Sequence, residues 1–233
     1  MVMADTSPPE KCVCHKAFEG FFLGGNVGYG YGSVKETITY LPALTLSEQL
    51  NAEVQGVDGG INVGYTHRFE NFGVGPEFVA NWATSQGTSL TTFVNNIVGN
   101  TTLRSQFRLN NSLQLRLNFS YIIANLVAPK IILGWDNSSW TRSDTLTLDA
   151  FTPADAYPIS TSTKARYNGF LFGIGSDFLM TEYLTAGVEY TGTLYQTVTS
   201  SSPAVFYNAE TYSPVSSSRP FYSKIALTLK LIY

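Results

Sequence analysis

Two cysteines and a histidine near the start of the chain are the first candidates for chemistry. Cys12, Cys14 and His15 lie within the segment CVCH, and thiolate and imidazole groups bind metal ions or take part in redox reactions. A closed zinc site needs more ligands than these, and the chain has no second cluster of such residues. A disulfide across one intervening residue would be strained. We therefore expect no metal site and no cofactor, and we interpret residues 1–19 as a flexible tail.

The second histidine, His67, is the other candidate for catalysis. Acyl transfer through a serine needs a histidine that accepts the proton of the hydroxyl group, and His67 stands alone at the end of a predicted strand. Three aspartates in polar segments could serve a hydrolase, but they form no paired motif; they are Asp144, Asp149 and Asp155. The sequence therefore predicts a protein that is not an enzyme.

The stretch GFFLGGNVGYGYG, residues 20–32, indicates which elements must position such groups. Large apolar residues alternate in it with small or polar ones, as in a β-strand whose side chains point to opposite faces. The alternation recurs in seven further segments, most of them long enough for a tilted membrane-spanning strand. The predicted strands are 20–32, 56–69, 74–83, 107–121, 127–140, 165–179, 184–195 and 221–233. Pro76 cannot donate to a ladder, so we expect a local break in pairing there.

The connections between these segments alternate in length. The short ones are 70–73, 123–126 and 180–183, and the long polar ones are 35–53, 85–104, 137–164 and 196–218. An even number of strands with short turns at one end and long loops at the other is typical of an outer-membrane barrel. We therefore predict an all-β fold over residues 20–233, an eight-stranded antiparallel transmembrane β-barrel with an up-and-down meander. Both chain ends would be periplasmic and the four long loops extracellular.

The composition fits this fold and excludes others. Charged residues make up 13% of the chain, against about 25% in a typical soluble domain. A formal net charge of −3 gives no reason to expect a nucleic-acid partner. No apolar run is long enough for a membrane-spanning helix. Residues 1–19 contain no apolar segment of a signal peptide, so the chain is either cytosolic or a mature form.

Charged residues decide which face of the strands points inward. Ten of them fall on the face of small and polar residues: Asp58, Arg68, Glu77, Arg108, Arg116, Lys130, Asp177, Glu189, Lys224 and Lys230. An eight-stranded barrel has room only for side chains, and the Phe, Tyr and Leu residues of the other face would overfill it. The aromatic face is therefore expected to contact lipid, and the glycines to line a narrow polar lumen. A soluble ligand-binding barrel with an apolar lumen is the remaining alternative.

Six of the lumen charges are expected to form a salt-bridged network, because an unpaired charge in a narrow interior is unfavourable. They are Arg68, Glu77, Arg116, Glu189, Lys224 and Lys230. Arg68 would lie diagonally across the first short turn from Glu77. Two interpretations of the network stay open, a structural plug and the lining of a small ion-conducting, porin-like channel.

Aromatic residues in the long polar loops are candidates for contact with a binding partner. They are Trp140, Phe151, Tyr157, Phe206, Tyr207 and Tyr212. Aromatic side chains among Ser, Thr and Asp suit recognition, although such loops can also merely cover the mouth of a barrel. Aromatic residues near strand ends, such as Tyr31, Trp82, Trp135 and Tyr233, are expected to form interfacial girdles.

The order and alternation of the strands resemble the small OmpA-like, opacity-type outer-membrane β-barrels of Gram-negative bacteria. GFFLGGNVGYGYG, GINVGYTHRF with GPEF, GFLFGIGSDF with LTAGVEY, and the terminal ALTLKLIY carry the resemblance. It implies an outer-membrane location, contact with outer-membrane lipid and lipopolysaccharide, and a C-terminal signal for the barrel-assembly machinery at Leu227, Leu229, Leu231 and Tyr233. It also implies a non-enzymatic surface protein that serves envelope structure, adhesion or host interaction through its extracellular loops.

Overall fold

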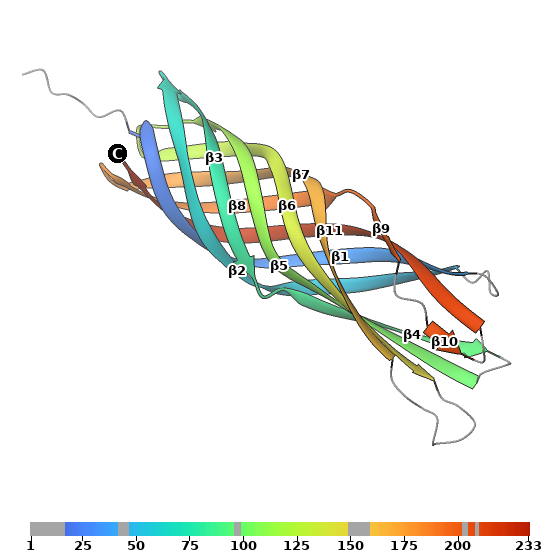
Figure 1. The fold of residues 1–233 in the computed structure, drawn as a ribbon. Helices are drawn as coiled ribbons and strands as arrows, with labels where there is room; N and C mark the ends of the chain where they lie inside the picture. Colours follow the sequence, from blue (N-terminus) through green and yellow to red (C-terminus); the bar gives the residue numbers. More distant parts are fainter. Residues whose placement is uncertain (1–16, 42–46, 96–98, 149–158, 202–204, 208–209) are drawn as a thin grey trace, which may run out of the picture.

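A computed structural model describes residues 17–41, 47–95, 99–148, 159–201, 205–207 and 210–233, and all its regular elements are β-strands (Figure 1). The strands are β1 (Gly20–Leu41), β2 (Ser47–Phe69), β3 (Phe72–Ala83), β4 (Gln86–Asn95), β5 (Gly99–Tyr121), β6 (Val127–Leu148), β7 (Ile159–Thr181), β8 (Leu184–Tyr195), β9 (Val198–Ser201), β10 (Val205–Tyr207) and β11 (Glu210–Ile232). Within these ranges the structure contains no helix that could span a membrane.

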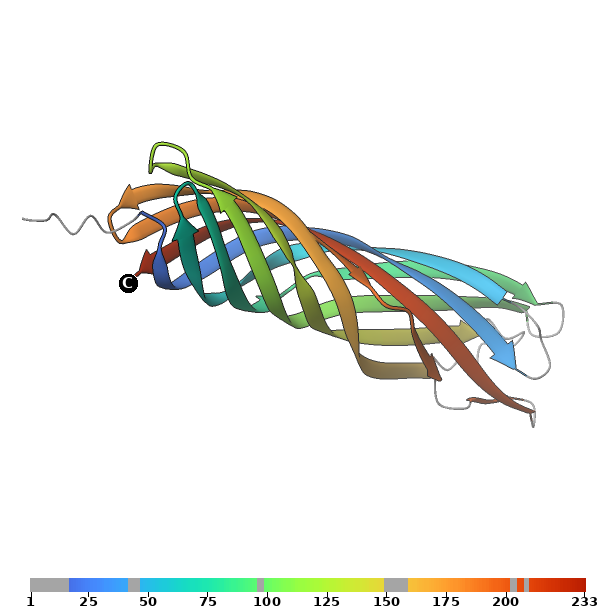
Figure 2. The same cartoon turned by 90° about the horizontal axis from the view of Figure 1, so that it is seen from above.

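The strands form one antiparallel ring. β1 closes it by pairing with β2 on one side and with β11 on the other. β3 and β4 both pair with β2 and β5, and β8 and β9 both pair with β11, so each pair fills one position of the ring. The ring thus has eight positions in chain order, and the predicted eight-stranded up-and-down meander is confirmed. Figure 2 shows the strands tilted around a common axis.

The three short turns and the described chain ends lie at one end of the ring, here called the short-turn end (Figure 1). Glu70, Ala124 and Asn125 have φ values of 54°, 50° and 55°, which tight turns require. The amide of Tyr233 donates to the carbonyl oxygen of Phe21 at 2.8 Å. The predicted short connections are therefore confirmed, and the C-terminus is held against the start of β1.

Much of the sequence predicted as long loops is paired strand. The β1–β2 ladder continues to Thr39 and Ser47, and the β6–β7 ladder to Leu146 and Ile159. These parts of the strands project beyond the barrel in Figures 1 and 2, and we call them the extension. Thr and Ser residues pair well in strands but lack the apolar alternation of a lipid-facing segment, which explains why the sequence pattern did not reveal them.

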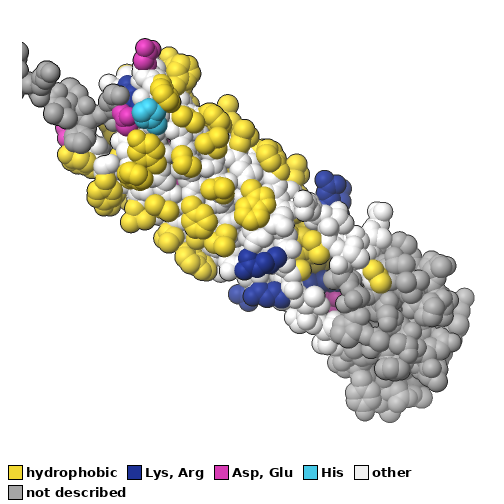
Figure 3. Space-filling view, turned by 45° about the horizontal axis from the view of Figure 1, so that its top comes forward, with side chains coloured by type: hydrophobic (Ala, Val, Ile, Leu, Met, Phe, Trp, Pro, Cys, Tyr) yellow, Lys and Arg dark blue, Asp and Glu magenta, His cyan; other side chains and the backbone are white. Residues whose placement is uncertain are grey.

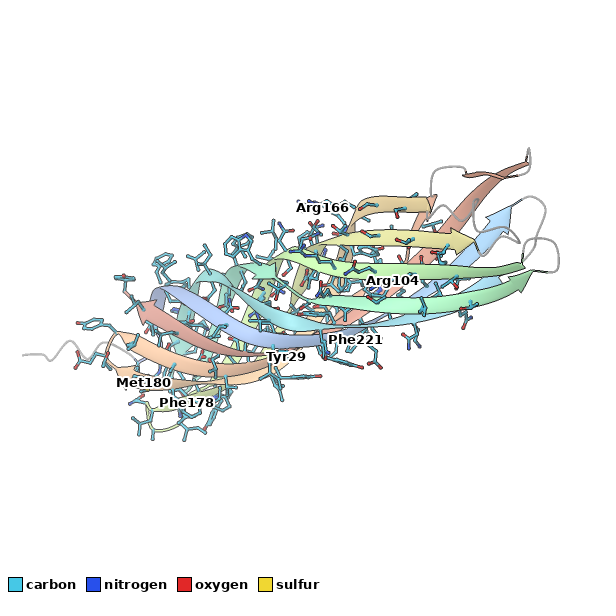
Figure 4. All side chains as sticks on the ribbon, turned by 90° about the horizontal axis from the view of Figure 1, so that it is seen from below. Tyr29, Arg104, Arg166, Phe178, Met180 and Phe221 are labelled. Atoms are coloured by element: carbon cyan, nitrogen blue, oxygen red, sulfur yellow. The ribbon has the colours of Figure 1, made fainter. Side chains whose placement is uncertain are left out.

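Large apolar side chains cover the outside of the ring, and we call them the apolar belt (Figure 3). Phe21, Val27 and Leu227 are 66%, 55% and 63% exposed, whereas the glycines between Val27 and Ser33 face the inside of the barrel. Figure 4 places Phe178 and Met180 near the short-turn end and Tyr29 and Phe221 toward the extension. The aromatic face of the first strand therefore points outward, as predicted.

Arg108 points outward, so the prediction that it faces the lumen is wrong. β5 contains a bulge, because Leu109 pairs with Trp140 while Asn111 pairs with Ser139. The extra residue reverses which side chains point inward. Arg116 is buried on one side of the bulge, whereas on the other side Phe107 and Leu109 are buried and Arg108 is exposed.

The pairing of β3 is interrupted at Pro76, which confirms that prediction. In the ladder with β2, Gly64 pairs with Glu77, and the next pair is His67 with Val74. Pro76 keeps its place opposite Leu117 on the β5 side. Since proline has no amide hydrogen, the break falls on the residue that cannot donate to the ladder.

Two glycines of β1, one on the inward face and one on the outward face of the strand, allow the assignment of these faces to be tested. A Cβ atom on Gly30 would lie 1.7 Å from the Tyr222 hydroxyl oxygen, whereas one on Gly25 would meet its nearest neighbour at 3.7 Å. We expect Gly30→Val to lower the free energy of unfolding by about 1–3 kcal/mol through overpacking. Gly25→Val should leave it within about 0.5 kcal/mol, because its side chain would extend outward. Denaturant unfolding in lipid vesicles measures both, and equal losses would contradict the assignment of the faces.

Candidate functional site

Six charged side chains meet inside the barrel toward the short-turn end, and we call them the charge network. They are Glu77, Asp177, Glu189, Arg116, Lys130 and Lys230. Glu189 lies at its centre, since its carboxylate is 2.9 Å from Arg116 Nη1, 2.7 Å from Lys130 Nζ and 3.8 Å from Lys230 Nζ. The network contains three acidic and three basic side chains, so its net charge is zero only when all six are present and charged.

The remaining contacts complete the charge network. Lys230 Nζ lies 3.5 Å from Glu77 Oε1 and 3.4 Å from Asp177 Oδ2, and Lys130 donates to both oxygens of Asp177 at 2.9 Å. Two amides also donate to the Glu77 carboxylate, Asn62 at 2.6 Å and Asn118 at 2.9 Å. Such buried charges are stable only when every partner is present.

Two of the six residues predicted for a lumen network lie elsewhere. Arg68 is at the short-turn end, where its guanidinium donates to the carbonyl oxygens of Glu70 and Ala17 instead of reaching Glu77. Lys224 lies nearer the extension and pairs with Asp58 at 2.5 Å. Conversely, Lys130 and Asp177 were predicted to face the lumen but not to join the network. Both residues occupy the alternate positions of their strands that face the lumen, as the other members do. The alternation in the sequence therefore already indicated that they could join the network.

A second polar cluster lies between the charge network and the extension. Lys224 Nζ donates to Asn26 Oδ1 at 2.7 Å in addition to its ion pair with Asp58. Gln114 links the two clusters, because its oxygen accepts a bond from Arg116 Nε at 2.9 Å and its amide donates to Ser112 at 3.2 Å. Asn81 donates to the same Ser112 hydroxyl and accepts a bond from Lys224 Nζ at 3.4 Å. The polar filling of the lumen is therefore continuous over this part of the barrel.

Four aromatic side chains fill the lumen above these polar clusters, and we call them the aromatic layer: Trp140, Tyr167, Tyr195 and Tyr222. The Trp140 ring lies 6.3, 6.0 and 6.3 Å from the rings of Tyr167, Tyr195 and Tyr222, each near perpendicular. Trp140 is 2% exposed, so the prediction that it contacts a partner from a loop is wrong. Along β6, Trp140 lies an even number of residues from Lys130 and Asp136, so its side chain points inward as theirs do.

The other predicted partner contacts have different positions. Phe151 and Tyr157 lie outside the described residues, as do Cys12, Cys14 and His15. Phe206, Tyr207 and Tyr212 belong to a hairpin of β10 and β11, in which Phe206 pairs with Thr211 and Tyr207 with Glu210. The predicted assembly signal faces outward, with exposed fractions of 63% for Leu227, 53% for Leu229, 46% for Leu231 and 74% for Tyr233.

The last residues of the predicted tail close the short-turn end of the lumen. Phe18 is buried and packs against Ile122 and Ala128. Glu19 Oε1 lies 3.3 Å from Nδ1 of His67, the histidine considered for catalysis. The part of the 1–19 segment that the structure describes is thus attached to the barrel.

The described interior leaves little free space. A cavity of about 30 Å³ lies between Phe22 and Lys230 near the short-turn end. Cavities of about 10 Å³ lie beside Tyr222 and Lys224 and beside Trp140 and Arg142. Because one water molecule needs roughly 10–15 Å³, each of the two smaller cavities suits one water and the third suits about two.

An ion-paired group lies inside the extension, beyond the apolar belt. Glu36 of β1 is 2% exposed and contacts the guanidinium of Arg142. Arg142 also pairs with Asp144, at 2.7 Å between Nη2 and Oδ2. Ser216 of β11 and Tyr167 of β7 face the same carboxyl group. Burial raises the pKa of Glu36 from 4.5 to about 7, which Asp144 reinforces and Arg142 opposes.

The raised pKa of Glu36 predicts that the free energy of unfolding depends on pH. A carboxyl group whose pKa is raised by folding stabilises the folded state fully below its unfolded pKa, and this contribution is lost as pH rises through the folded pKa. Glu36 should therefore make the protein less stable at pH 8 than at pH 5, by no more than about 3 kcal/mol. Denaturant unfolding of the wild type and Glu36→Gln at both pH values isolates this difference. An unchanged pH dependence in the variant would contradict the assignment.

Comparison with known proteins adds the family. The model of the autotransporter β-domain matches residues 13–191, most of the chain. The chain belongs to the autotransporter β-domain family. The protein is therefore a bacterial outer-membrane β-barrel, and the apolar belt is its lipid-facing surface. The narrower resemblance to OmpA-like, opacity-type barrels stays a prediction.

Solved structures similar to this member of the autotransporter β-domain family are also outer-membrane proteins. The outer membrane protease OmpT from Escherichia coli is 9% identical, with a TM-score of 0.52 and coverage of 93% of this chain and 97% of that one. OprG from Pseudomonas aeruginosa is 15% identical, with a TM-score of 0.47 and coverage of 94% and 99%. The attachment invasion locus protein Ail of Yersinia pestis is 10% identical, with a TM-score of 0.33 and coverage of 87% and 98%. No curated protein matches the chain. At these identities the likeness to OmpT concerns the fold alone.

Proposed function

We propose that this outer-membrane barrel is a non-enzymatic surface protein that binds its partner through the extension. In this proposal the short-turn end is periplasmic and the extension reaches outside the cell, where it contacts a host or another surface. The observation that carries the proposal is the division of the molecule into a filled barrel and long paired hairpins beyond the apolar belt (Figure 1). The described strands of these hairpins lie beyond the apolar belt, where a partner outside the membrane can reach them, and this suits recognition.

The filling of the lumen supports a closed barrel rather than an ion channel. The charge network and the aromatic layer occupy successive levels of the lumen, and the cavities beside them have volumes of only about 10–30 Å³. Moving these side chains aside would separate charges that balance one another in a place with little water. Planar-bilayer recordings should therefore show no steady conductance for the wild type, and an open-pore current would favour the channel instead.

The placement of the candidate catalytic groups supports a non-enzymatic role. His67 is paired with Glu19 at the short-turn end, and Asp144 is paired with Arg142 inside the extension. Both candidates are thus held by an oppositely charged side chain. Asp149 and Asp155, the other predicted candidates, lie outside the described residues.

Shortening one hairpin tests the binding role. Ser143 of β6 pairs with Ser162 of β7, so residues 144–161 can be replaced by an Asn-Gly turn that keeps the ladder below them. The variant and the wild type would be displayed on a non-adherent Gram-negative host, and attachment to epithelial cells and immobilised matrix proteins would be counted. We expect attachment to fall at least tenfold while heat-dependent gel mobility, the sign of a folded barrel, is retained.

A second shortened hairpin serves as the comparison. Replacing residues 38–48 by the same turn leaves Thr37 paired with Gln49 and removes a different tip. Loss of attachment in either variant, with the barrel folded, supports the proposal. Full attachment by both variants, or by a barrel that lacks both hairpins, would overturn it.

The exposed residues of the last strand support a second part of the proposal, recognition by the barrel-assembly machinery. Leu227, Leu229 and Leu231 form one outward row that ends at Tyr233. In the folded barrel this row faces lipid, and before insertion it is an apolar stripe with an aromatic end. The row is thus available as a signal before the barrel closes.

A further inference from the structure

Six exposed cations follow the edge of the apolar belt where the extension begins, and we call them the basic arc. They are Lys35, Arg104, Arg108, Lys164, Arg166 and Arg219. Figure 3 shows Lys and Arg side chains at this edge, and Figure 4 places Arg104 and Arg166 on the extension side of the belt. Among the described residues, none of the six forms an ion pair with a carboxylate. The arc is therefore a band of mainly positive charge at the edge of the apolar belt, with the exposed Glu53 as the diagonal neighbour of Lys35.

The strand register brings members of the arc together. Lys35 of β1 and Arg219 of β11 lie directly opposite each other. Arg108 and Lys164 both flank Thr141 of β6, one from β5 and one from β7. Like charges opposite each other destabilise a sheet, so these positions favour an anion that both can contact.

A groove opens in the outer surface next to Arg219. β8 ends at Tyr195 and β9 begins at Val198. After the bond from the Gln196 amide to the Asn168 carbonyl oxygen at 2.8 Å, residues 159–167 of β7 have ladder partners only on β6. This gap leaves a groove of about 510 Å³ over β6, β7, β8 and β11. Its lining includes Trp135, Phe170, Leu194, Asn168, Gln196 and Arg219.

The two ends of the groove differ in chemistry. On the belt side, Trp135 and Leu194 flank Phe170 in register, and the three are 48%, 45% and 55% exposed. On the extension side, Arg219 lines the groove. Arg166 lies close by, and its Nη1 donates to Asn137 Oδ1 at 2.5 Å. A ligand that fills the groove therefore needs apolar groups at one end and an anionic group at the other.

We propose that this groove binds the phosphorylated, acylated glycolipid of the outer leaflet, the lipid A part of lipopolysaccharide. Its acyl chains lie over Trp135, Phe170 and Leu194, and its phosphate accepts hydrogen bonds from Arg219 and Arg166, with Lys35 as a further positive charge. Guanidinium groups match phosphate oxygens in geometry as well as charge. The inference rests on the orientation given under the proposed function, in which the extension is extracellular, but not on adhesion.

The test measures lipid binding by the full chain folded in non-ionic detergent with a chelator present. Native mass spectrometry would compare diphosphorylated lipid A with the same glycolipid after removal of its phosphates. We expect the wild type to prefer the phosphorylated lipid at least tenfold. Arg219→Gln should weaken its binding by about tenfold, the usual effect of losing one charge-assisted hydrogen bond.

Matched variants separate a specific groove from general positive charge. Arg104→Gln removes the same charge from the arc on β5, away from the groove, and should change binding less than twofold. Lys35→Gln serves as the second variant next to Arg219 and should weaken binding at least threefold. Equal binding of the two lipids, or equal losses for Arg104→Gln and Arg219→Gln, would overturn the proposal. Heat-dependent gel mobility verifies that each variant is folded, and attachment through the hairpins is an independent readout.

Discussion

Glu189→Gln is expected to lower the free energy of unfolding by about 3–5 kcal/mol, although it changes one oxygen to an amide group. Glu189 is 2% exposed and lies within ion-pair distance of Arg116, Lys130 and Lys230. Without its charge the network carries three cations and two acids, and the excess positive charge stays buried in a narrow lumen. Equilibrium unfolding in urea, with the protein in lipid vesicles, measures the loss.

The matched control is Glu53→Gln, the same chemical change on an outward-facing carboxylate of β2. Because Glu53 is exposed, its substitution should alter stability by less than about 0.5 kcal/mol. A loss for Glu189→Gln as small as that for Glu53→Gln would mean that the charge network does not hold the barrel together. It would also reopen the interpretation of the lumen as a hydrated ion pathway.

Trp140→Ala is expected to cost about 3–5 kcal/mol, the range for truncating a fully buried large aromatic side chain. The Trp140 ring contacts three tyrosine rings at 6.0–6.3 Å between centroids, and its removal leaves a cavity in the aromatic layer. The result also distinguishes this position from a loop contact, whose truncation would leave the stability of the barrel nearly unchanged. The same unfolding assay applies.

Trp82→Ala is the control for Trp140. Trp82 faces outward and is 59% exposed, so lipid or detergent fills the space that its ring leaves. We expect a loss less than half that of Trp140→Ala, since no cavity forms. Near-equal losses would contradict the placement of Trp140 inside the lumen. Bilayer recordings of Trp140→Ala would show in addition whether the aromatic layer blocks ions.

The alternation of residues along the chain is enough to predict the strand number, the order of the meander and the lipid-facing side. Side chains in a strand alternate strictly, so placing Phe21 and Val27 outward places Gly28 and Gly30 inward. The break at Pro76 follows from the missing amide hydrogen of proline. These features follow from local backbone geometry, so they can be predicted from a single sequence.

Which charges meet, and where the alternation reverses, depends on the closed ring. Arg116 and Glu189 are 73 residues apart and lie on strands that are not neighbours in the ring. Their contact depends on the tilt and stagger of the closed barrel, which no local pattern encodes. The bulge between Leu109 and Asn111 turns Arg108 outward, and the length of the β6 ladder carries Trp140 into the lumen. Local alternation therefore specifies the fold and its faces, whereas the network, the aromatic layer and the groove at Arg219 exist only because ring closure brings distant strands together.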